Sequence, residues 1–340
     1  MKILVTGGAG FIGSNFIKYL FQEKSCRKIV NLDKLTYAGN LENLRDVEYH
    51  PDYIFIKGDI ADKPLVDKLF SEHEFQAVIN FAAESHVDRS IMDSSPFIKT
   101  NITGTQVLLE TARKYGVEKF IQVSTDEVYG SLELQEPPFT EKSPLRPNSP
   151  YSASKAGADL LCRAYFKTYG LPVIITRCSN NYGPYQFPEK FVPLCITNII
   201  ENKPIPIYGN GLNVRDWIHV KDHCRALFFV LENGKPGEVY NIGAEQEKTN
   251  LAVVKAILEA MGKNHKLINY VQDRPGHDQR YALDAAKIRN FLGWSPEIKF
   301  DEGLVSLIRW YTKYRPWWER VKNGDYQNYA RQWYGGLGKF

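Results

Sequence analysis

The residues with the clearest chemical potential lie in two neighbouring segments of the chain. The first contains Thr125, Asp126 and Glu127, and the second contains Tyr151 and Lys155. Tyr151 and Lys155 are four residues apart in a segment with helical periodicity, which places both side chains on one helix face. An ammonium group beside a phenol favours the phenolate, so we expect Lys155 to lower the pKa of Tyr151 toward a value useful for a base. Taken alone, Tyr-x-x-x-Lys also occurs on helices by chance.

Asp126 and Glu127 would add an acid and a base to this set. The apolar residues 120–123 predict a short buried strand, and open α/β sheets bind ligands at the carboxyl ends of their strands. Oxidation of an alcohol needs one base, which Tyr151 supplies. Elimination of water needs a base for a C–H group and an acid for the leaving hydroxide, and two carboxyl groups with different pKa values can divide these roles. The alternative is that one carboxylate caps a helix or turn.

The amino terminus predicts the element that positions this chemistry. Strand residues 2–6 lead directly into a glycine-rich turn with G-x-x-G-x-x-G spacing, formed by Gly7, Gly10 and Gly13. Glycine lets backbone N–H groups approach a pyrophosphate at the start of the following helix. A second strand, residues 28–32, ends at Asp33, about 20 residues beyond the turn, where a carboxylate hydrogen-bonds the adenosine ribose of NAD. Asp33 favours NAD over NADP, although Lys34 leaves that preference open.

Further strands alternate with helices and predict a doubly wound parallel sheet of the Rossmann type. A third strand at residues 53–58 ends at Asp59 and Ile60, which we expect near the adenine. A fourth strand, residues 77–81, leads into Ala82 and Ala83, small residues that suit the space beside a dinucleotide. The charged residues that follow, His86 and Asp88, are expected in a solvated loop. Helices are predicted for residues 101–115 and 152–169.

Composition excludes several other classes of protein. The 340 residues are 24% charged and 43% hydrophobic, which is ordinary for a globular protein, and the net charge of +4 is too small to indicate a nucleic-acid partner. No apolar run reaches membrane-spanning length, and no signal peptide is apparent. The cysteines are odd in number and scattered, at Cys26, Cys162, Cys178, Cys195 and Cys224. We therefore expect reduced thiols and a cytoplasmic location.

Several motifs together resemble the extended short-chain dehydrogenase/reductase family, and within it the 4,6-dehydratases of nucleotide sugars. The motifs cover nearly the whole chain: residues 7–13, Asn101 in Asn-Ile-Thr-Gly-Thr, and segments 81–90, 124–130, 151–155, 177–184, 187–191, 215–220 and 273–278. The resemblance implies NAD-dependent dehydration of dTDP-glucose to the 4-keto-6-deoxy sugar in deoxysugar biosynthesis. It implies that Tyr151, Lys155, Thr125, Asp126 and Glu127 are catalytic. It also implies a homodimer formed through the helices near 101–115 and 152–169.

The same resemblance implies two sets of binding residues. The cofactor set is Gly7, Gly10, Phe11, Ile12, Gly13, Asp33, Lys34, Thr36, Asp59, Ile60, Phe81, Ala82, Ala83, Ser85, Thr100, Tyr151, Lys155 and Asn181. The substrate set is Ser85, Thr125, Asn180, Glu189, Lys190, Arg215, Asn250, Arg274 and His277. A diphosphate requires cationic donors, and arginine can bind it with two hydrogen bonds, although a single arginine is more often a solvated surface charge.

Beyond Lys155 the pattern predicts a smaller, discontinuous substrate-binding region. Proline and glycine cluster from residue 183 to 193, and residues 237–243 look like a strand that returns to the main sheet. We therefore expect an NAD-binding domain at residues 1–180 plus about 216–243. The nucleotide-sugar domain would comprise residues 181–215 and 244–340.

Other readings of the sequence stay open. A UDP-glucose dehydratase, a sugar-nucleotide epimerase and a non-catalytic NAD sensor are alternatives, but a sensor needs neither the Tyr–Lys pair nor the carboxylates. His219 and His223 are spaced to share a metal on a helix, but no acidic third ligand is evident and no metal is expected. Aromatic and basic residues interleave in the tail, at Trp310, Tyr311, Tyr314, Trp317, Trp318, Tyr326, Tyr329, Trp333 and Tyr334. We expect a terminal helix packed on the small domain rather than a single-strand nucleic-acid site.

Overall fold

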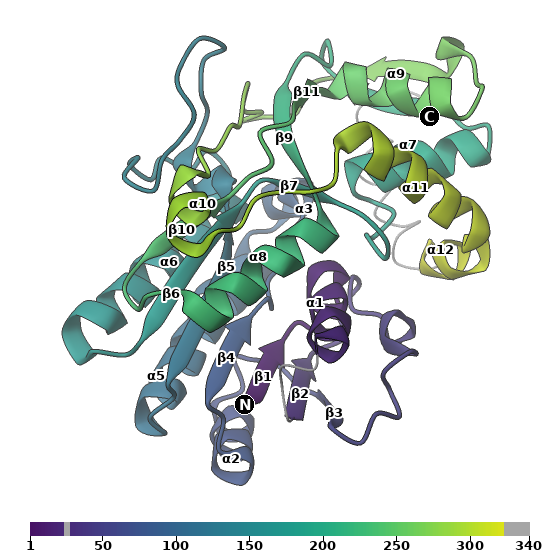
Figure 1. The fold of residues 1–340 in the computed structure, drawn as a ribbon. Coiled ribbons are helices and arrows are strands. Elements are labelled where there is room, and N and C mark those ends of the chain that lie inside the picture. Colours follow the sequence, from purple (N-terminus) through teal and green to yellow (C-terminus); the bar gives the residue numbers. More distant parts are fainter. Residues whose placement is uncertain (24–27, 323–340) are drawn as a thin grey trace.

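A parallel seven-stranded sheet lies at the centre of the molecule (Figure 1). The structure is a computed structural model that describes residues 1–23 and 28–322. The spatial strand order is β10-β6-β5-β4-β1-β2-β3. The strands are β1 (Lys2–Thr6), β2 (Lys28–Asp33), β3 (Tyr53–Lys57), β4 (Ala77–Asn80), β5 (Lys119–Thr125), β6 (Val173–Cys178) and β10 (Val239–Ile242). The predicted doubly wound Rossmann sheet is confirmed, including the returning strand β10, which pairs with β6.

Helices cover both faces of this sheet, because alternate strand residues point to opposite sides. In β1, Ile3 and Val5 pack into one apolar layer and Leu4 into the other. The first layer is covered by α1 (Phe11–Gln22), α8 (Val220–Asn233) and α10 (Ala286–Leu292). The second is covered by α2 (Lys63–His73), α5 (Thr105–Lys114) and α6 (Pro150–Tyr169). The predicted helix at 101–115 begins earlier, as a π-helical turn, η2 (Ile98–Gly104), that leads into α5.

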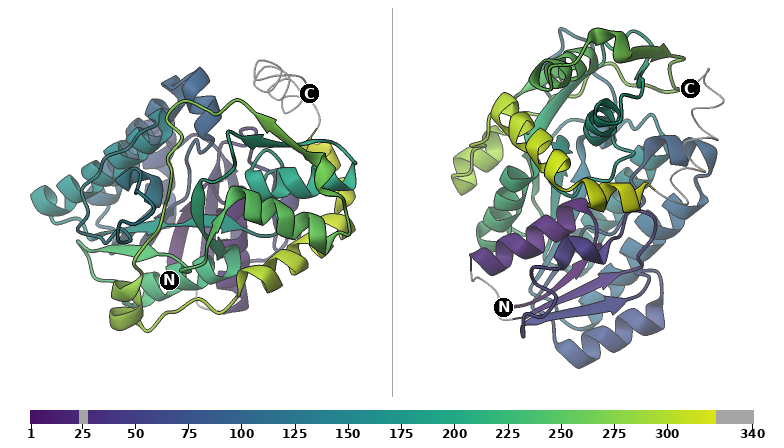
Figure 2. Two further views of the ribbon diagram at one scale, coloured as in Figure 1. Left: turned by 90° about the horizontal axis from the view of Figure 1, so that it is seen from above. Right: turned by 90° about the vertical axis from the view of Figure 1, so that its right-hand side faces the viewer.

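A smaller region lies at the carboxyl-end side of the sheet (Figures 1 and 2). Its strands form a three-stranded sheet and a two-stranded sheet: β11-β9-β7 and β12-β8. They are β7 (Asn180–Tyr182), β8 (Ile205–Tyr208), β9 (Val214–His219), β11 (Glu247–Thr249) and β12 (Ile268–Val271). Its helices are α7 (Phe191–Ile200), α9 (Asn250–Ala260), η4 (His265–Leu267), α11 (Phe300–Lys313) and α12 (Arg315–Val321), and they share one apolar core. The irregular segment predicted up to residue 193 therefore ends where α7 begins, at Phe191.

The chain crosses between the two regions repeatedly. Strand β9 pairs with β7 and β11 of the small region, whereas α8, which follows it directly, packs on the main sheet. Later, Ile288 and the fully buried Trp294 return to the core of the main sheet. The division into two domains stays a prediction, and this packing would assign residues 285–294 to the NAD-binding side.

Short elements hold in place the segments that carry the predicted catalytic residues. Helix α6 begins at a capping box formed by Ser149 and Ser152, with Pro150 in its first turn, so Tyr151 lies in the first turn. The remaining short helices are η1 (Leu41–Leu44), α3 (Val87–Met92), α4 (Ser95–Phe97) and η3 (Asp126–Tyr129). No helix of the described chain is both long and apolar enough to span a membrane.

The aromatic residues of the tail divide at the end of α12. Trp310, Tyr311, Trp317 and Trp318 pack in or against the core of the small region, as expected for a terminal amphipathic helix. Cys26, Tyr326, Tyr329, Trp333 and Tyr334 lie outside the described residues. Of the described cysteines, Cys162, Cys178, Cys195 and Cys224 are all buried and free of disulfides.

Candidate active site

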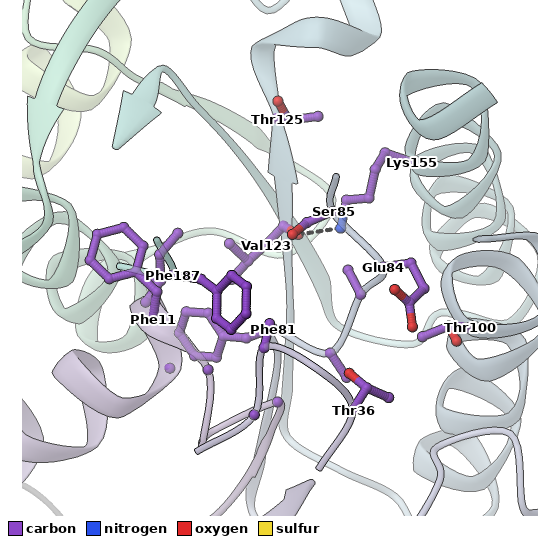
Figure 3. Close-up of a pocket in the computed structure, with 18 of the residues that line it drawn as sticks. Phe11, Thr36, Phe81, Glu84, Ser85, Thr100, Val123, Thr125, Lys155 and Phe187 are labelled. Atoms are coloured by element: carbon purple, nitrogen blue, oxygen red, sulfur yellow. Dashed lines mark hydrogen bonds between the residues drawn. The ribbon is translucent and has the colours of Figure 1, made fainter. Parts of the chain in front are cut away.

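A cavity of about 300 Å³ opens at the carboxyl ends of the parallel strands. The segments that follow β1, β2, β3, β4, β5 and β6 all contribute to its lining. Figure 3 shows Phe11, Phe81 and Phe187 on one side of this space, with Glu84, Thr100 and Lys155 on the other. This is the position at which open α/β sheets bind their ligands.

The glycine-rich turn forms the floor of the cavity. Gly7 has φ +69°, and a Cβ there would lie 2.6 Å from the backbone nitrogen of Ala82, so a side chain is excluded. A Cβ on Gly13 would lie 2.5 Å from the Gly7 carbonyl oxygen. Helix α1 starts here with Gly10 as its N-cap and has no side-chain cap and no acidic residue in its first turn. Its amino-terminal N–H groups therefore remain able to bind a pyrophosphate.

The carboxylate of Asp33 lies at the end of β2 and is held by two backbone amides. Ala9 N donates to one oxygen and Leu35 N to the other, both at 2.8 Å. Burial raises the pKa of Asp33, and the two hydrogen bonds oppose that rise. At the rim, Lys34 forms an ion pair with Asp59 at 2.9 Å. That pairing gives Lys34, the cation that left the NAD preference open, a carboxylate partner within the protein.

The structure brings the whole predicted cofactor set to this one cavity. Each of the following residues lines it: Gly7, Gly10, Phe11, Ile12, Gly13, Asp33, Lys34, Thr36, Asp59, Ile60, Phe81, Ala82, Ala83, Ser85, Thr100, Tyr151, Lys155 and Asn181. These features match the parts of a dinucleotide. The glycine-rich turn and the start of α1 suit the pyrophosphate, and the Asp33 carboxylate suits the adenosine ribose. The residues present therefore fit NAD.

Tyr151 and Lys155 face the cavity from α6, but their electrostatic relation differs from the prediction. Lys155 Nζ donates to the Val123 carbonyl oxygen at 2.8 Å, the dashed line in Figure 3, and burial lowers its pKa. Burial also raises the pKa of Tyr151 well above its ordinary value, and the Glu127 carboxylate adds to that rise. A hydrogen bond with Thr125 acts in the opposite direction. The predicted lowering of the Tyr151 pKa is wrong here because desolvation and the Glu127 carboxylate outweigh the Thr125 hydrogen bond.

Asp126 and Glu127 form η3, directly after β5, and their environments differ. Asp126 is 2% exposed, and Thr125 Oγ1 donates to its Oδ1 at 3.1 Å. Burial and the neighbouring Glu127 raise the pKa of Asp126 well above its ordinary value. Burial raises the pKa of Glu127 too, but the cations of Arg274, Arg215 and Lys190 lower it. The pKa of Asp126 is thus raised well above its ordinary value and that of Glu127 is raised less, a difference that favours Asp126 as the acid and Glu127 as the base.

Those three cations reach Glu127 from separate parts of the chain. Lys190 is the N-cap of α7, and its Nζ donates to the Ser85 carbonyl oxygen at 2.5 Å. Arg215 in β9 donates to the carbonyl oxygens of Val214 at 2.7 Å and Asp278 at 2.9 Å. Its guanidinium also lies 4.2 Å from the centre of the Tyr281 ring. The result is a concentration of positive charge beside the carboxylate pair.

Arg274 is positioned by an acidic partner that the sequence did not reveal. Its Nη1 lies 3.2 Å from Oδ1 of Asp88, and Tyr208 donates to the other oxygen of Asp88 at 2.9 Å. Asp88 is 3% exposed and His86 is 6% exposed, so the expectation of a solvated loop is wrong for both. His86 is the N-cap of α3 and Asp88 lies in its first turn. The ion pair with Arg274 offsets the cost of burying the Asp88 carboxylate.

The remaining predicted substrate residues occupy different positions. Ser85, Thr125, Asn180, Glu189 and Lys190 line the cavity, whereas Arg215, Asn250, Arg274 and His277 lie outside its lining. Arg89 Nη2 donates to Glu189 at 2.9 Å, so this carboxylate is engaged by the protein itself. His277 pairs with Asp273 at 2.6 Å, and Asn250 is the first residue of α9. The roles of these residues in binding stay predictions.

Some residues at the cavity were missed by sequence reasoning. Tyr37 and Phe187 line it and pack edge to face at 5.6 Å, and the Arg89 guanidinium lies 3.9 Å from the Tyr37 ring centre. Tyr37 directly follows the predicted contact Thr36, which was the available signal for it. Phe187 and Arg89 come from distant segments, and nothing local in the sequence connects them to Tyr37.

The two histidines considered as metal ligands have structural partners instead. His219 accepts a hydrogen bond from Lys221 N at 3.2 Å and caps α8. His223 Nδ1 lies 2.9 Å from Asn181 Oδ1, and burial lowers the pKa of His223 to about 3. A neutral His223 therefore donates this bond and orients Asn181 at the cavity. Among residues 1–23 and 28–322, no group of three potential ligands is placed to hold a metal ion.

Comparison with known proteins identifies the group to which this arrangement belongs. A family profile described as GDP-mannose 4,6 dehydratase matches residues 4–307. A relative from Neisseria meningitidis serogroup B, named dTDP-glucose 4,6-dehydratase, is 51% identical over 346 residues, covering 96% of this chain and 97% of the relative. The chain belongs to the dTDP-glucose 4,6-dehydratase family.

Solved structures of that family have the same fold. The dTDP-glucose 4,6-dehydratase from Bacillus anthracis, in complex with NAD, is 53% identical, with a TM-score of 0.89 and coverage of 95% of this chain and 100% of that one. The Streptomyces venezuelae dTDP-glucose 4,6-dehydratase, with NAD and TYD bound, is 49% identical, with a TM-score of 0.92 and the same coverage. The extended short-chain dehydrogenase/reductase resemblance is confirmed at the level of this family.

Proposed function

We propose that this protein is an NAD-dependent hydro-lyase that converts dTDP-glucose to dTDP-4-keto-6-deoxy-glucose. The observation that carries the proposal is the meeting of two functional pairs in one cavity. Tyr151 and Lys155 belong to an alcohol-oxidising site, and Asp126 and Glu127 add an acid and a base. The relatives named above support dTDP-glucose as the substrate rather than UDP-glucose. An epimerase or an NAD sensor would have no use for the carboxylate pair.

The glycine-rich turn, the start of α1 and Asp33 would hold the dinucleotide. When bound, NAD accepts a hydride from the sugar and later returns it, and it brings a positive charge into the cavity. That charge would oppose the desolvation that raises the pKa of Tyr151. Lys155, fixed by the Val123 carbonyl, would hold the cofactor ribose and support the phenolate.

Tyr151 would accept the proton from O4 of the sugar as C4 is oxidised, and Thr125 would hydrogen-bond O4. The 4-keto group then acidifies the hydrogen on C5. Glu127, the more readily ionised of the pair, would remove that C5 proton. Asp126, whose pKa burial raises well above its ordinary value, would give its proton to O6 as water leaves. The unsaturated ketone would then take back the same hydride at C6 and a proton at C5 from Glu127, so the reaction is redox-neutral.

Deuterium placed at C4 of dTDP-glucose tests this function. We expect it at C6 of the product, and the product to be lighter than the substrate by one water. Substrate that carries deuterium at C4 and a second isotope elsewhere in the sugar can be mixed with unlabelled substrate. No deuterium should then appear in product molecules that lack the second isotope, because each hydride returns to its own sugar. Loss of the label to solvent, or a need for stoichiometric NAD, would identify an ordinary dehydrogenase. A parallel reaction with UDP-glucose tests whether the enzyme prefers the thymine or the uracil nucleotide.

Replacing Arg274 with alanine is expected to weaken binding of the sugar nucleotide by about 1.5–3 kcal/mol, the range for hydrogen bonds to charged groups. Affinity for NAD should change little, because Arg274 lies outside the cavity lining and pairs with Asp88. Titration calorimetry with dTDP and NAD separates the two affinities. Arg289→Ala is the control, since Arg289 forms an exposed pair with Glu245. Unchanged dTDP affinity in Arg274→Ala would place the diphosphate elsewhere.

We further infer a homodimer and a cytoplasmic location. Exposed apolar side chains along η2 and α6, among them Ile98, Leu160 and Tyr169, support a partner surface at these helices. The free thiols of the described cysteines support a reducing compartment.

A further inference from the structure

The last described helix, α12, bonds directly to the NAD-binding side of the molecule. The indole Nε1 of Trp317 donates to Asn43 Oδ1 at 3.0 Å, across 274 positions of sequence. Trp317 is 6% exposed and Asn43 is 1% exposed, so water cannot substitute for this bond. Arg320, one turn further, pairs with Glu42 at the protein surface. Figure 1 shows the yellow α12 at the edge of the small region that faces α1.

Asn43 continues this connection into the glycine-rich turn. Its Nδ2 donates to the Ala9 carbonyl oxygen at 2.9 Å, and Asn40 N donates to the same oxygen at 3.0 Å. On its other side, Ala9 N donates to the Asp33 carboxylate. The two peptide groups of Ala9 are therefore fixed on both sides. One binds the Asp33 carboxylate, which is expected at the ribose, and the other binds the Asn43 amide, which α12 holds through Trp317.

The same aromatic cluster also reaches a residue of the cavity lining, Gln186. The Trp317 ring packs edge to face against Tyr185 and Trp310, with centroids 5.8 and 5.2 Å apart. Tyr311, in the same cluster, donates to the Gln186 carbonyl oxygen at 2.5 Å, and Gln186 lines the cavity. Lys18 of α1 lies 4.0 Å from the Tyr185 ring centre. One cluster is thus linked to the glycine-rich turn through Asn43 and to the cavity lining through Gln186.

We propose that Asn43 and Trp317 are positioning residues for the cofactor, through which α12 holds the glycine-rich turn in its NAD-binding conformation. The inference rests on the proposed NAD site. Neither side chain lines the cavity, so each acts through Ala9. The consequence is that retention of NAD between turnovers depends on a helix of the small region. A redox-neutral reaction restores the oxidised dinucleotide in each cycle, so one bound dinucleotide can serve successive turnovers.

Trp317→Phe removes the indole N–H and keeps an aromatic ring in the cluster. We expect the dissociation constant for NAD to rise about ten-fold, since a buried amide oxygen loses its donor and the turn is no longer held. Asn43→Asp keeps an acceptor for Trp317 but presents a carboxylate oxygen to the Ala9 carbonyl, and it should weaken NAD binding at least as much. A ten-fold rise in the dissociation constant corresponds to about 1.4 kcal/mol. At saturating NAD, kcat should stay within about two-fold of the unsubstituted protein, because no catalytic group is altered.

Calorimetric titration of protein freed of NAD measures these constants, with dTDP titrated into the same samples. Arg320→Ala is the matched control on α12, because it removes only the exposed pair with Glu42 and should change NAD affinity less than two-fold. Unchanged dTDP affinity shows that the variants are folded. Wild-type NAD affinity in both variants, or parallel loss of NAD and dTDP binding, would overturn the inference. If the unsubstituted protein itself failed to bind NAD, the proposed function would fall instead.

Discussion

Tyr151→Phe is expected to reduce the rate of C4 oxidation by about 10²–10⁴-fold, the usual contribution of a positioned acid–base group. The substitution removes only the phenolic hydroxyl. The ring packs with Phe97 at a centroid distance of 6.3 Å and with Val87, and phenylalanine preserves those contacts. Mixing protein and dTDP-glucose in a single turnover and following the absorbance of reduced cofactor measures the rate.

Tyr165→Phe is the matched control for this experiment. Tyr165 lies on the same helix, and its hydroxyl donates to Glu110 at 3.1 Å, away from the cavity. Loss of that hydroxyl should leave oxidation unchanged. Affinity for NAD and dTDP should be retained in Tyr151→Phe. Wild-type cofactor reduction in Tyr151→Phe would remove the phenol from the mechanism.

Asp126→Asn and Glu127→Gln are expected to slow elimination by about 10²–10⁴-fold while leaving oxidation much less affected. Neither carboxyl group is assigned to the C4 step, so the 4-keto-glucose nucleotide should accumulate on the enzyme. Rapid quenching followed by mass spectrometry detects it. Glu118→Gln is the control, because exposed Glu118 precedes the opposite end of β5. Rapid elimination in both variants would locate the acid and the base elsewhere.

The dependence of elimination on pH follows from the two raised pKa values. Asp126 must be protonated to act as an acid, so the rate should fall as pH rises through its raised pKa. Glu127 must be ionised to act as a base, so the rate should fall as pH drops through its own pKa. The two limbs form a bell whose apparent pKa values belong to the coupled pair. In Asp126→Asn the high-pH limb should disappear.

Local sequence patterns predicted the fold and the cofactor cavity because each depends on short-range order. The glycine spacing, the strand end at Asp33 and the small residues Ala82 and Ala83 are read directly along the chain. Their meeting at one edge follows from the topology of parallel strands. The spacing of Tyr151 and Lys155 likewise follows from helix geometry. These features are the ones that the structure bears out in the fold and brings together at the cavity.

What the sequence could not supply was the partner of each buried charge. Asp88 looks like a loop residue until Arg274, 186 positions later, is placed 3.2 Å from it. The pKa of Tyr151 depends on how deeply the phenol is buried and on the nearby Glu127. Neither the burial nor this proximity can be predicted from the spacing of residues along the chain. The bond between Trp317 and Asn43 joins segments with no shared local pattern. Such contacts depend on the path of the whole chain.

The return of residues 285–294 to the main sheet constrains how the protein is made. One face of the sheet is incomplete until Ile288 and the fully buried Trp294 join the apolar layer that includes residues of α8 and β10. A chain growing on the ribosome therefore exposes apolar surface on α1 and α8 until nearly 300 residues have been synthesised, at about 5–20 residues per second. Apolar surface exposed in this way is of the kind that favours aggregation of incompletely folded chains. Completion of the cofactor-binding half comes late in translation, although its glycine-rich turn is made first.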